Sequence, residues 1–390
     1  MKVLMINSVC GIRSTGRICT DIAELLEGKG YECKIAYGRE DVPEKYQKYA
    51  VKIGNNLSVR LDALKSRCLD NAGFNSRLAT KKFIKWVEEY NPDVIHLHNL
   101  HGYYLNIEIL FKYLKTCGKK IVWTMHDCWA FTGHCAYFDS IGCNKWEKGC
   151  EYCLQKKKYP QSLLLDKSKL NYQKKRELFT NVSNMIIVTP SRWLANLISR
   201  SFLKQYEIQV IPNGIDVNIF QPMRSDLRER YALQNKQILL GVASTWNRYK
   251  GLNDFIELSK HLEEQYQIVL IGVSKAQLKM LPPQVIGIER TNNVKELAQW
   301  YSTADVFLNL TYEDNYPTVN LEAQACGTPV ITYATGGSVE SVPSTGVVDK
   351  GNLDQIRALL SMPQREWIKE LYTGVDKNTY YSKYIKIYEE

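Results

Sequence analysis

The chain of 390 residues is predicted to fold as an α/β protein with two doubly wound domains. Short apolar runs alternate along it with amphipathic segments, a pattern typical of parallel strands covered by helices. The alternation runs from residue 2 to about residue 202 and starts again at residue 237. We therefore expect domains at 1–205 and 206–365, and a helical tail at 366–390 that packs back on the N-terminal domain.

Each expected domain opens with a buried strand. In the first domain we expect strands at 2–9, 31–38 and 184–191, helices at 19–30 and 192–202, and helix-to-strand segments at 83–98 and 105–126. Residues 10–17 are expected to form a loop. In the second domain we expect strands at 237–245, 266–272, 305–310 and 329–334, and helices at 251–265, 294–304 and 320–326. Ligands of such sheets bind beyond the carboxyl ends of the strands, so a cleft between two facing domains is the expected site.

The net charge of +10 comes from an excess of Lys and Arg in the first 200 residues. Such asymmetry favours an anionic partner, either nucleic acid or a membrane surface, although ordinary solvated helix faces also explain it. Residues 77–87 and 156–179 suit anionic lipid headgroups, whereas no nucleic-acid recognition module accompanies them. No apolar run approaches the roughly 20 residues that span a bilayer. The N-terminus resembles a buried strand more than a signal peptide, so we expect a cytoplasmic protein, peripheral at the inner face of the membrane.

Three acids surround a predicted helix start in the second domain. Glu313 and Asp314 precede a helix that begins near Thr318, and Glu322 follows within it. A helix N-terminus offers free amides and suits a diphosphate, whereas carboxylates accept hydrogen bonds from sugar hydroxyls. The segment, with Asn315 and Tyr316 between the acids, therefore predicts a site for a nucleotide sugar. Acids that merely complement the helix dipole would explain Glu322 but not the loop before it.

This segment resembles the signature of retaining glycosyltransferase family 4, two acids separated by seven residues. Asp314 and Glu322 fit that spacing, whereas Glu313 gives eight. The family's first acid is a Glu, so either Asp314 replaces it or Glu313 acts from a shifted loop; the spacing favours Asp314. Further resemblance extends over nearly the whole chain, in residues 210–220, 250–258, 297–310 and 334–342. It implies the GT-B fold, with two Rossmann-like domains and the active site in the cleft.

A cation near the acids is expected to hold the diphosphate. Lys250 opens a helix after a strand, where an ammonium neutralises the departing diphosphate. The resembled family pairs this Lys with an Arg five or six positions earlier, but Ser244 and Thr245 stand there, and Arg248 is the nearest substitute. The chain contains no Asp-x-Asp pair, so we expect no catalytic metal.

The resemblance also assigns residues in the first domain. It implies that the glycine loop faces the donor phosphate, with Gly16 permitting close backbone approach and Arg17 meeting an anionic group. It implies as well that His126 lies near the donor sugar and positions it by a hydrogen bond. His96 and His98 share one strand face, where they either line the acceptor side or bond locally.

Cysteines cluster in residues 135–153. Cys135, Cys143, Cys150 and Cys153 include a C-x2-C pair, and four thiolates suffice for tetrahedral zinc. A subgroup of bacterial polysaccharide glycosyltransferases that the chain resembles has a similar Cys-rich loop. The pattern therefore predicts structural zinc, with buried free thiols as the alternative.

Together these features predict a retaining hexosyltransferase. It would move a hexose from a nucleotide-sugar donor to a hydroxyl of a saccharide or lipid-linked oligosaccharide acceptor, in capsule or O-antigen biosynthesis. Two alternatives stay open: a sugar-nucleotide epimerase of the same architecture, and a non-catalytic, basic, zinc-stabilised binding protein.

Overall fold

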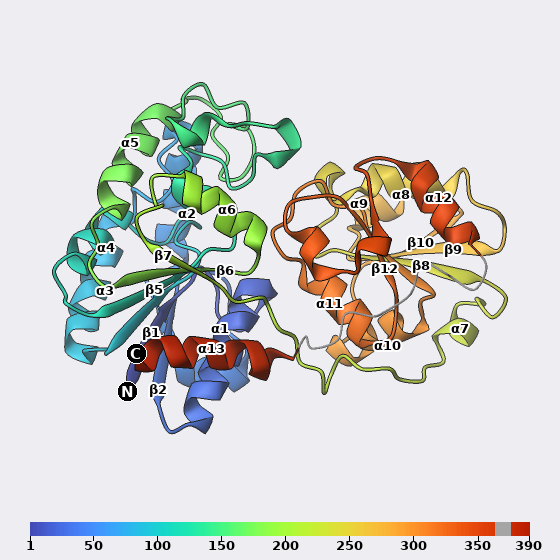
Figure 1. Cartoon of the computed structure of the whole chain (residues 1–390), viewed down its shortest axis with the longest axis horizontal. Coiled ribbons are helices and arrows are strands. Elements are labelled where there is room, and N and C mark those ends of the chain that lie inside the picture. Colours follow the sequence, from blue (N-terminus) through green and yellow to red (C-terminus); the bar gives the residue numbers. More distant parts are fainter. Residues whose placement is uncertain (363–375) are drawn as a thin grey trace. The chain divides into compact units, whose positions relative to one another are not determined.

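The computed structural model describes residues 1–362 and 376–390, which divide into two compact units. Unit 1 comprises Met1–Pro212 and Tyr380–Glu390, and unit 2 comprises Asn213–Thr379 (Figure 1). The division falls later than the expected boundary at 205/206 because strand β7 (Glu207–Val210) pairs with β6 (Met185–Thr189). None of the helices in the described residues is both long enough and apolar enough to cross a bilayer.

Unit 1 is built on a sheet of seven parallel strands in the order β3-β2-β1-β4-β5-β6-β7. The remaining strands are β1 (Lys2–Ile6), β2 (Glu32–Tyr37), β3 (Ala50–Lys52), β4 (Val94–Leu97) and β5 (Lys120–Thr124). Its helices are α1 (Arg13–Gly28), α2 (Asn56–Leu69), α3 (Arg77–Tyr90), α4 (Ile107–Leu114), α5 (Ser168–Phe179), α6 (Arg192–Arg200) and most of α13 (Lys377–Glu389).

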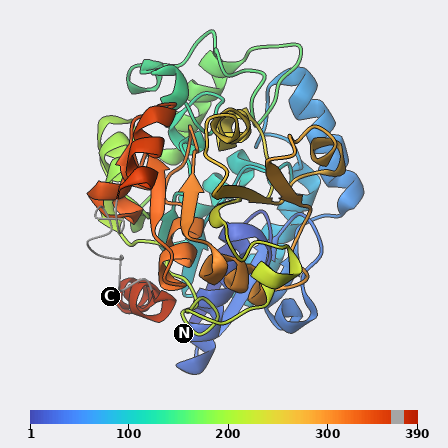
Figure 2. The same cartoon turned by 90° about the vertical axis from the view of Figure 1, so that its right-hand side faces the viewer.

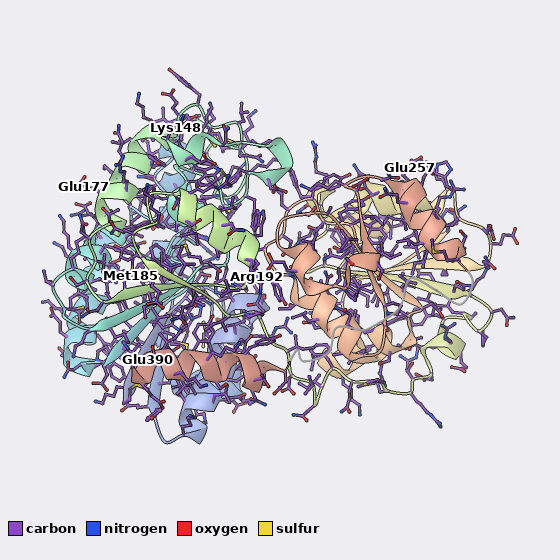
Figure 3. The ribbon with its side chains drawn as sticks, in the orientation of Figure 1. Lys148, Glu177, Met185, Arg192, Glu257 and Glu390 are labelled. Atoms are coloured by element: carbon purple, nitrogen blue, oxygen red, sulfur yellow. The ribbon has the colours of Figure 1, made fainter. Side chains whose placement is uncertain are left out.

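Alternating residues of the strands divide the interior of unit 1 into two cores, as expected for a sheet buried on both faces. Leu4, Ile95 and Ile121 pack with α3, α4 and α6, whereas Val3 and Val94 pack with α1 and α13. The C-terminal helix thus completes the core of unit 1, and Glu390 lies at its end (Figure 3). The part of the expected tail at 366–375 lies outside the described residues.

Unit 2 contains a six-stranded parallel sheet in the order β10-β9-β8-β11-β12-β13, with helices on both faces (Figures 1 and 2). The strands are β8 (Gln237–Val242), β9 (Tyr266–Ile271), β10 (Val285–Ile288), β11 (Val306–Asn309), β12 (Val330–Tyr333) and β13 (Val347–Val348). The helices are α7 (Leu227–Arg230), α8 (Leu252–Ser259), α9 (Lys275–Leu278), α10 (Val294–Thr303), α11 (Thr318–Ala325) and α12 (Leu353–Ser361). One core includes residues of α10 and α11, and the other includes residues of α8 and α12.

Candidate functional site

The strand order of unit 2 reverses between β8 and β11, which are hydrogen-bonded neighbours although β9 and β10 come between them in sequence. At such a point the chain leaves the two strands toward opposite faces of the sheet, which leaves room for a ligand beyond their carboxyl ends. The loop after β8 carries Arg248 and Lys250, and the loop after β11 carries residues 313–316. Two segments that the sequence singled out thus lie at one sheet edge.

Backbone contacts fix these two loops to each other. The Tyr312 amide donates to the Tyr249 carbonyl at 2.8 Å, and the Thr311 hydroxyl donates to the same oxygen at 3.2 Å. Gly251 has φ +76°, and a Cβ there would collide with the Leu310 carbonyl oxygen. Only glycine therefore satisfies both the conformation and the close approach at this turn.

The contact between the loops brings Lys250 to one of the predicted acids. Lys250 Nζ lies 2.7 Å from Asp314 Oδ2, and the two side chains are 38% and 17% exposed. Asp314 Oδ1 accepts the Asn315 amide at 2.9 Å. Asp314, the acid that the spacing favours, is thus the partner of the lysine, while Glu313 accepts the Thr311 hydroxyl through its backbone carbonyl. The ion pair is partly open to solvent, so an anionic ligand can reach it.

The acids precede a helix whose N-cap residue makes no side-chain hydrogen bond to the first helical amides. Helix α11 begins at Thr318, and its N-cap position is Pro317, which cannot cap through its side chain. Thr318 is itself helical, so the predicted start of the helix near this residue is confirmed. Asn315 and Tyr316 are buried in the loop, where the Tyr316 carbonyl accepts the Asn213 side-chain amide at 3.0 Å. The terminus keeps its partial positive charge close to the Lys250 loop.

Two further predicted donor residues, Glu322 and Arg248, differ from each other in burial. Glu322 is only 2% exposed, and its Oε2 accepts the Tyr301 hydroxyl of α10 at 3.0 Å. Arg248 is exposed, with its guanidinium 5.3 Å from the centre of the Tyr249 ring. Glu322 is thus held in place from inside unit 2, whereas Arg248 projects from the loop surface.

The glycine loop of unit 1 is shorter than expected, because α1 begins at Arg13 and not after residue 17. Gly16 is buried, and its carbonyl accepts the Gly11 amide at 3.1 Å. A Cβ on Gly16 would lie 3.1 Å from Val9 and 3.2 Å from the Gly11 nitrogen. The small residue therefore lets α1 pack on the preceding loop. Arg17 is partly exposed on the same helix.

Histidines meet at the carboxyl ends of β4 and β5. His126 Nε2 lies 3.0 Å from His98 Nδ1, and the His98 and His96 ring centres are 4.0 Å apart, so the two strand histidines share a face as predicted. Both ring nitrogens of His96 are bonded, to Thr124 and to Tyr388 of α13. Burial lowers the pKa of His126 to about 4 and that of His98 well below its usual range. These rings are therefore neutral at physiological pH.

A second chain of polar groups, whose contacts the sequence reasoning did not predict, extends from the same edge. The Tyr159 hydroxyl donates to His101 Nδ1 at 2.9 Å, and His101 Nε2 donates to Asp127 Oδ2 at 2.7 Å. Asp127 thus orients the His101 ring and favours the tautomer with its proton on Nε2. The position of Asp127 directly after the predicted His126 was the one available signal.

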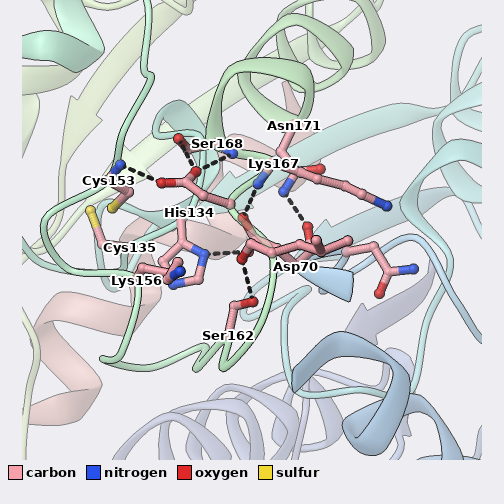
Figure 4. A network of polar contacts seen from close by, with 12 residues as sticks. Asp70, His134, Cys135, Cys153, Lys156, Ser162, Lys167, Ser168 and Asn171 are labelled. Atoms are coloured by element: carbon pink, nitrogen blue, oxygen red, sulfur yellow. Dashed lines mark hydrogen bonds and ion pairs between the residues drawn. The ribbon is translucent and has the colours of Figure 1, made fainter. Parts of the chain in front are cut away.

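The four predicted zinc ligands line one small cavity of about 20 Å³ together with His134. The Cys135 thiol donates to Cys153 Sγ, which lowers the pKa of Cys153 and raises that of Cys135. Asp70 at the end of α2 contacts His134, Lys167 and Asn171 (Figure 4). In residues 1–362 and 376–390, no three Cys, His, Asp or Glu side chains are placed as a metal's ligands. Structural zinc therefore stays a prediction.

Comparison with known families gives two matches that together cover most of the chain. Residues 15–219 match the family described as Glycosyltransferase Family 4, and residues 223–365 match Glycosyl transferases group 1. The first match alone includes more than half of the 390 residues.

A curated relative and two solved structures resemble the chain. A putative colanic acid biosynthesis glycosyl transferase of Escherichia coli (strain K12) is 26% identical over 267 residues, which span 65% of this chain and 63% of the relative. Sucrose-phosphate synthase from Thermosynechococcus elongatus has a TM-score of 0.72 at 16% identity, over 100% of this chain and 98% of that one. Anabaena HepE in complex with UDP has a TM-score of 0.68 at 14% identity, over 99% of each chain. These two structures share the fold of the chain.

Proposed function

Because the chain belongs to glycosyltransferase family 4 and has the GT-B fold, we propose that it transfers a sugar from a nucleotide-sugar donor to an acceptor hydroxyl. One observation carries this proposal: the Lys250–Asp314 ion pair stands beside the side-chain-uncapped start of α11, at the switch point of the unit 2 sheet. An ammonium and free helix amides favour a diphosphate, and the adjacent carboxylate favours hydroxyl groups.

The donor we propose is a nucleoside diphosphate sugar, and UDP is the nucleotide to test first. HepE, a structural neighbour, was solved with UDP, which supports this choice. The diphosphate would compete with Asp314 for Lys250, and Asp314 or Glu313 would then orient hydroxyls of the hexose. Glu322, held through Tyr301, would accept hydrogen bonds from the ribose. Asn315, Tyr316 and Arg248 complete the proposed donor side.

The reaction we propose retains the anomeric configuration. The bond from the anomeric carbon to the diphosphate oxygen breaks, a bond from that carbon to the acceptor oxygen forms, and the acceptor proton passes to the leaving diphosphate. Lys250 would stabilise the charge that develops on that leaving group. The neutral His126 ring is suited to hydrogen-bond a sugar hydroxyl, and Gly16 and Arg17 would face the donor phosphate. No catalytic metal takes part in this scheme.

The acceptor we propose is a saccharide on a lipid carrier, in the assembly of a bacterial surface polysaccharide. The Escherichia coli relative is a putative colanic acid biosynthesis glycosyl transferase, which supports this class. The proposal places the protein in the cytoplasm and at the inner face of the membrane, where such an acceptor is presented.

Structural zinc is a separate proposal for the Cys-rich segment. The cavity is large enough for one ion, but the cysteines would have to rotate, because none of the described side chains form a ready ligand set. Elemental analysis of protein purified without chelator should give about one zinc per chain. A folded, zinc-free chain in which the thiols of Cys135, Cys143, Cys150 and Cys153 are all free would contradict this proposal.

A panel of sugar nucleotides tests the proposed function. At least one UDP-sugar should raise the melting temperature, and incubation of that donor with saccharide acceptors should release UDP and give a glycosylated product. Formation of an epimer without acceptor would instead indicate the epimerase alternative. Absence of any stabilising nucleotide would contradict a donor site in unit 2.

A further inference from the structure

Helix α2 exposes leucines and buries polar side chains, which is the reverse of an ordinary surface helix. Its exposed face carries Leu57, Leu61 and Leu64, which are 65%, 50% and 59% exposed and follow the helical repeat. Asp62 and Ser66 on the same helix are buried. A surface helix normally buries its leucines and exposes its acids, so this reversed pattern needs a cause outside the core.

A polar network holds the inner face of α2. Asp62 accepts hydrogen bonds from Ser66 at 3.0 Å, from the Asn75 amide at 3.1 Å and from Ser76 at 2.5 Å. Asp70, at the end of the helix, receives the Lys167 amide at 2.6 Å (Figure 4). Because these buried polar atoms have partners, rotating α2 to hide its leucines would break several hydrogen bonds. The orientation is fixed by the fold, and the leucines stay outside.

A second group of exposed leucines lies against the end of α2. The Leu163 amide donates to the Arg67 carbonyl at 2.7 Å, and the Leu165 amide donates to the Cys68 carbonyl at 3.4 Å. Leu163, Leu164 and Leu165 are all exposed. We call the six residues Leu57, Leu61, Leu64, Leu163, Leu164 and Leu165 the leucine surface. Exposed leucines that gather on neighbouring segments in this way are typical of an interaction surface.

Positive charge accompanies the leucine surface. The exposed basic residues of α2 are Arg60, Lys65 and Arg67, and the chain before Leu163 carries Lys156, Lys157 and Lys158. The acids of residues 56–70 are Asp62 and Asp70, and both are buried. Two copies of this surface would repel each other, whereas anionic lipid headgroups would attract it.

We infer that the leucine surface docks unit 1 onto an anionic lipid bilayer, with leucines at the acyl boundary and the basic side chains among the headgroups. This inference rests on the proposed function, which places the protein at the membrane, and names the surface that makes the contact; it uses none of the donor-binding residues. Of the two stretches that the sequence suggested for lipid contact, 156–179 contains Leu163, Leu164 and Leu165, whereas 77–87 lies outside the leucine surface. Helix α3 buries Phe83 and Val87 in the core, so its apolar face is already occupied.

Vesicle flotation of the full chain tests the inference. The chain should bind phosphatidylcholine vesicles that contain phosphatidylglycerol and should not bind pure phosphatidylcholine vesicles, and raised salt should weaken the binding. The double variant Leu61→Ser, Leu64→Ser should lose binding by about tenfold or more. Replacing Arg60, Lys65 and Arg67 with Gln should cost about fivefold for each charge removed.

A matched control lies in unit 2. Met280 is 77% exposed, more than Leu61 or Leu64, so Met280→Ser removes an exposed apolar side chain from outside the surface and should leave vesicle binding unchanged. No binding to anionic vesicles, equal binding to neutral ones, or equal losses in the control would overturn the inference. So would concentration-dependent dimers that the leucine variant abolishes without any vesicle binding. UDP affinity of the leucine variant should equal that of the unaltered chain, so failure of docking and failure of the donor site are distinguishable.

Discussion

The polar groups at the carboxyl edges of the two sheets differ in charge. In unit 2, a cation and an acid face each other 2.7 Å apart and stay partly exposed beside a helix start. In unit 1, His96, His98 and His126 form a row of rings that burial keeps neutral. The first arrangement suits a ligand of high negative charge, and the second suits uncharged hydroxyls. The same sheet topology thus supports two different chemistries through the residues of a few loops.

Removing the cation of unit 2 should have the largest effect on activity. We expect Lys250→Ala to lower kcat about 100- to 1000-fold, the range typical for losing one group that stabilises developing negative charge. The control is Lys260→Ala, which removes an exposed lysine paired with Glu257 in the same unit. Equal rates for the Lys250 variant and the control would remove Lys250 from the reaction.

Protonating the histidines His96, His98 and His126 should destabilise unit 1. Burial lowers the pKa of His96 to about 3, below its value in an unfolded chain, so its contribution is complete above pH 6.5 and is lost as the pH falls toward 3. At pH 4.5 this one residue should reduce the free energy of unfolding by about 2 to 3 kcal/mol. Denaturant titrations at pH 8 and 4.5 measure the change. His96→Gln should show a smaller pH dependence than the exposed control His261→Gln, and identical slopes would contradict the assignment.

Disturbing the contact between the two unit 2 loops should affect stability and donor binding together. In Gly251→Ala the new Cβ meets the Leu310 carbonyl, which we expect to cost about 2 to 4 kcal/mol of unfolding free energy. Gly30→Ala is the control, because Gly30 has φ +78° and nothing within 4 Å of its added Cβ. It should show only the backbone cost of about 1 kcal/mol. Two equal losses would mean that the loop contact is not tight.

Removing the charge of Glu322 should have a smaller effect. Glu322→Gln keeps the size of the side chain and an acceptor for the Tyr301 hydroxyl, so the fold should persist. We expect donor affinity to fall about tenfold, because a charge-assisted hydrogen bond to the ribose becomes a neutral one. Thermal shifts with the stabilising donor measure the change. If the donor raised the melting temperature of Glu322→Gln as much as that of the unaltered chain, Glu322 would have no role in donor binding.

The sequence predicted the alternating strands and the segments that meet at the switch point, because apolar periodicity and turn residues are local signals. Asp314 and Lys250 followed from spacing and resemblance, and the pairing of β8 with β11 brings them together. The His98–His126 contact depends on the pairing of β4 with β5 and could not be derived from either segment alone.

Helix α2 was the clearest omission, and its reason is physical. A periodicity argument assumes that leucines face the core, but here Asp62 finds partners at Asn75 and Ser76, which lie outside the helix. The loop expected at 10–17 was too long because Arg13, with φ +56°, already starts the helix. The side-chain network around Asp62 joins two segments, which the sequence of α2 alone does not display.

Calorimetric titration of UDP into the full chain, Lys250→Ala and Lys260→Ala tests the central claim most directly. The account predicts measurable UDP binding by the unaltered chain. It predicts that Lys250→Ala lowers the affinity for UDP by about tenfold or more and that Lys260→Ala leaves it unchanged. Equal affinities in all three proteins would contradict a diphosphate site at the switch point of unit 2.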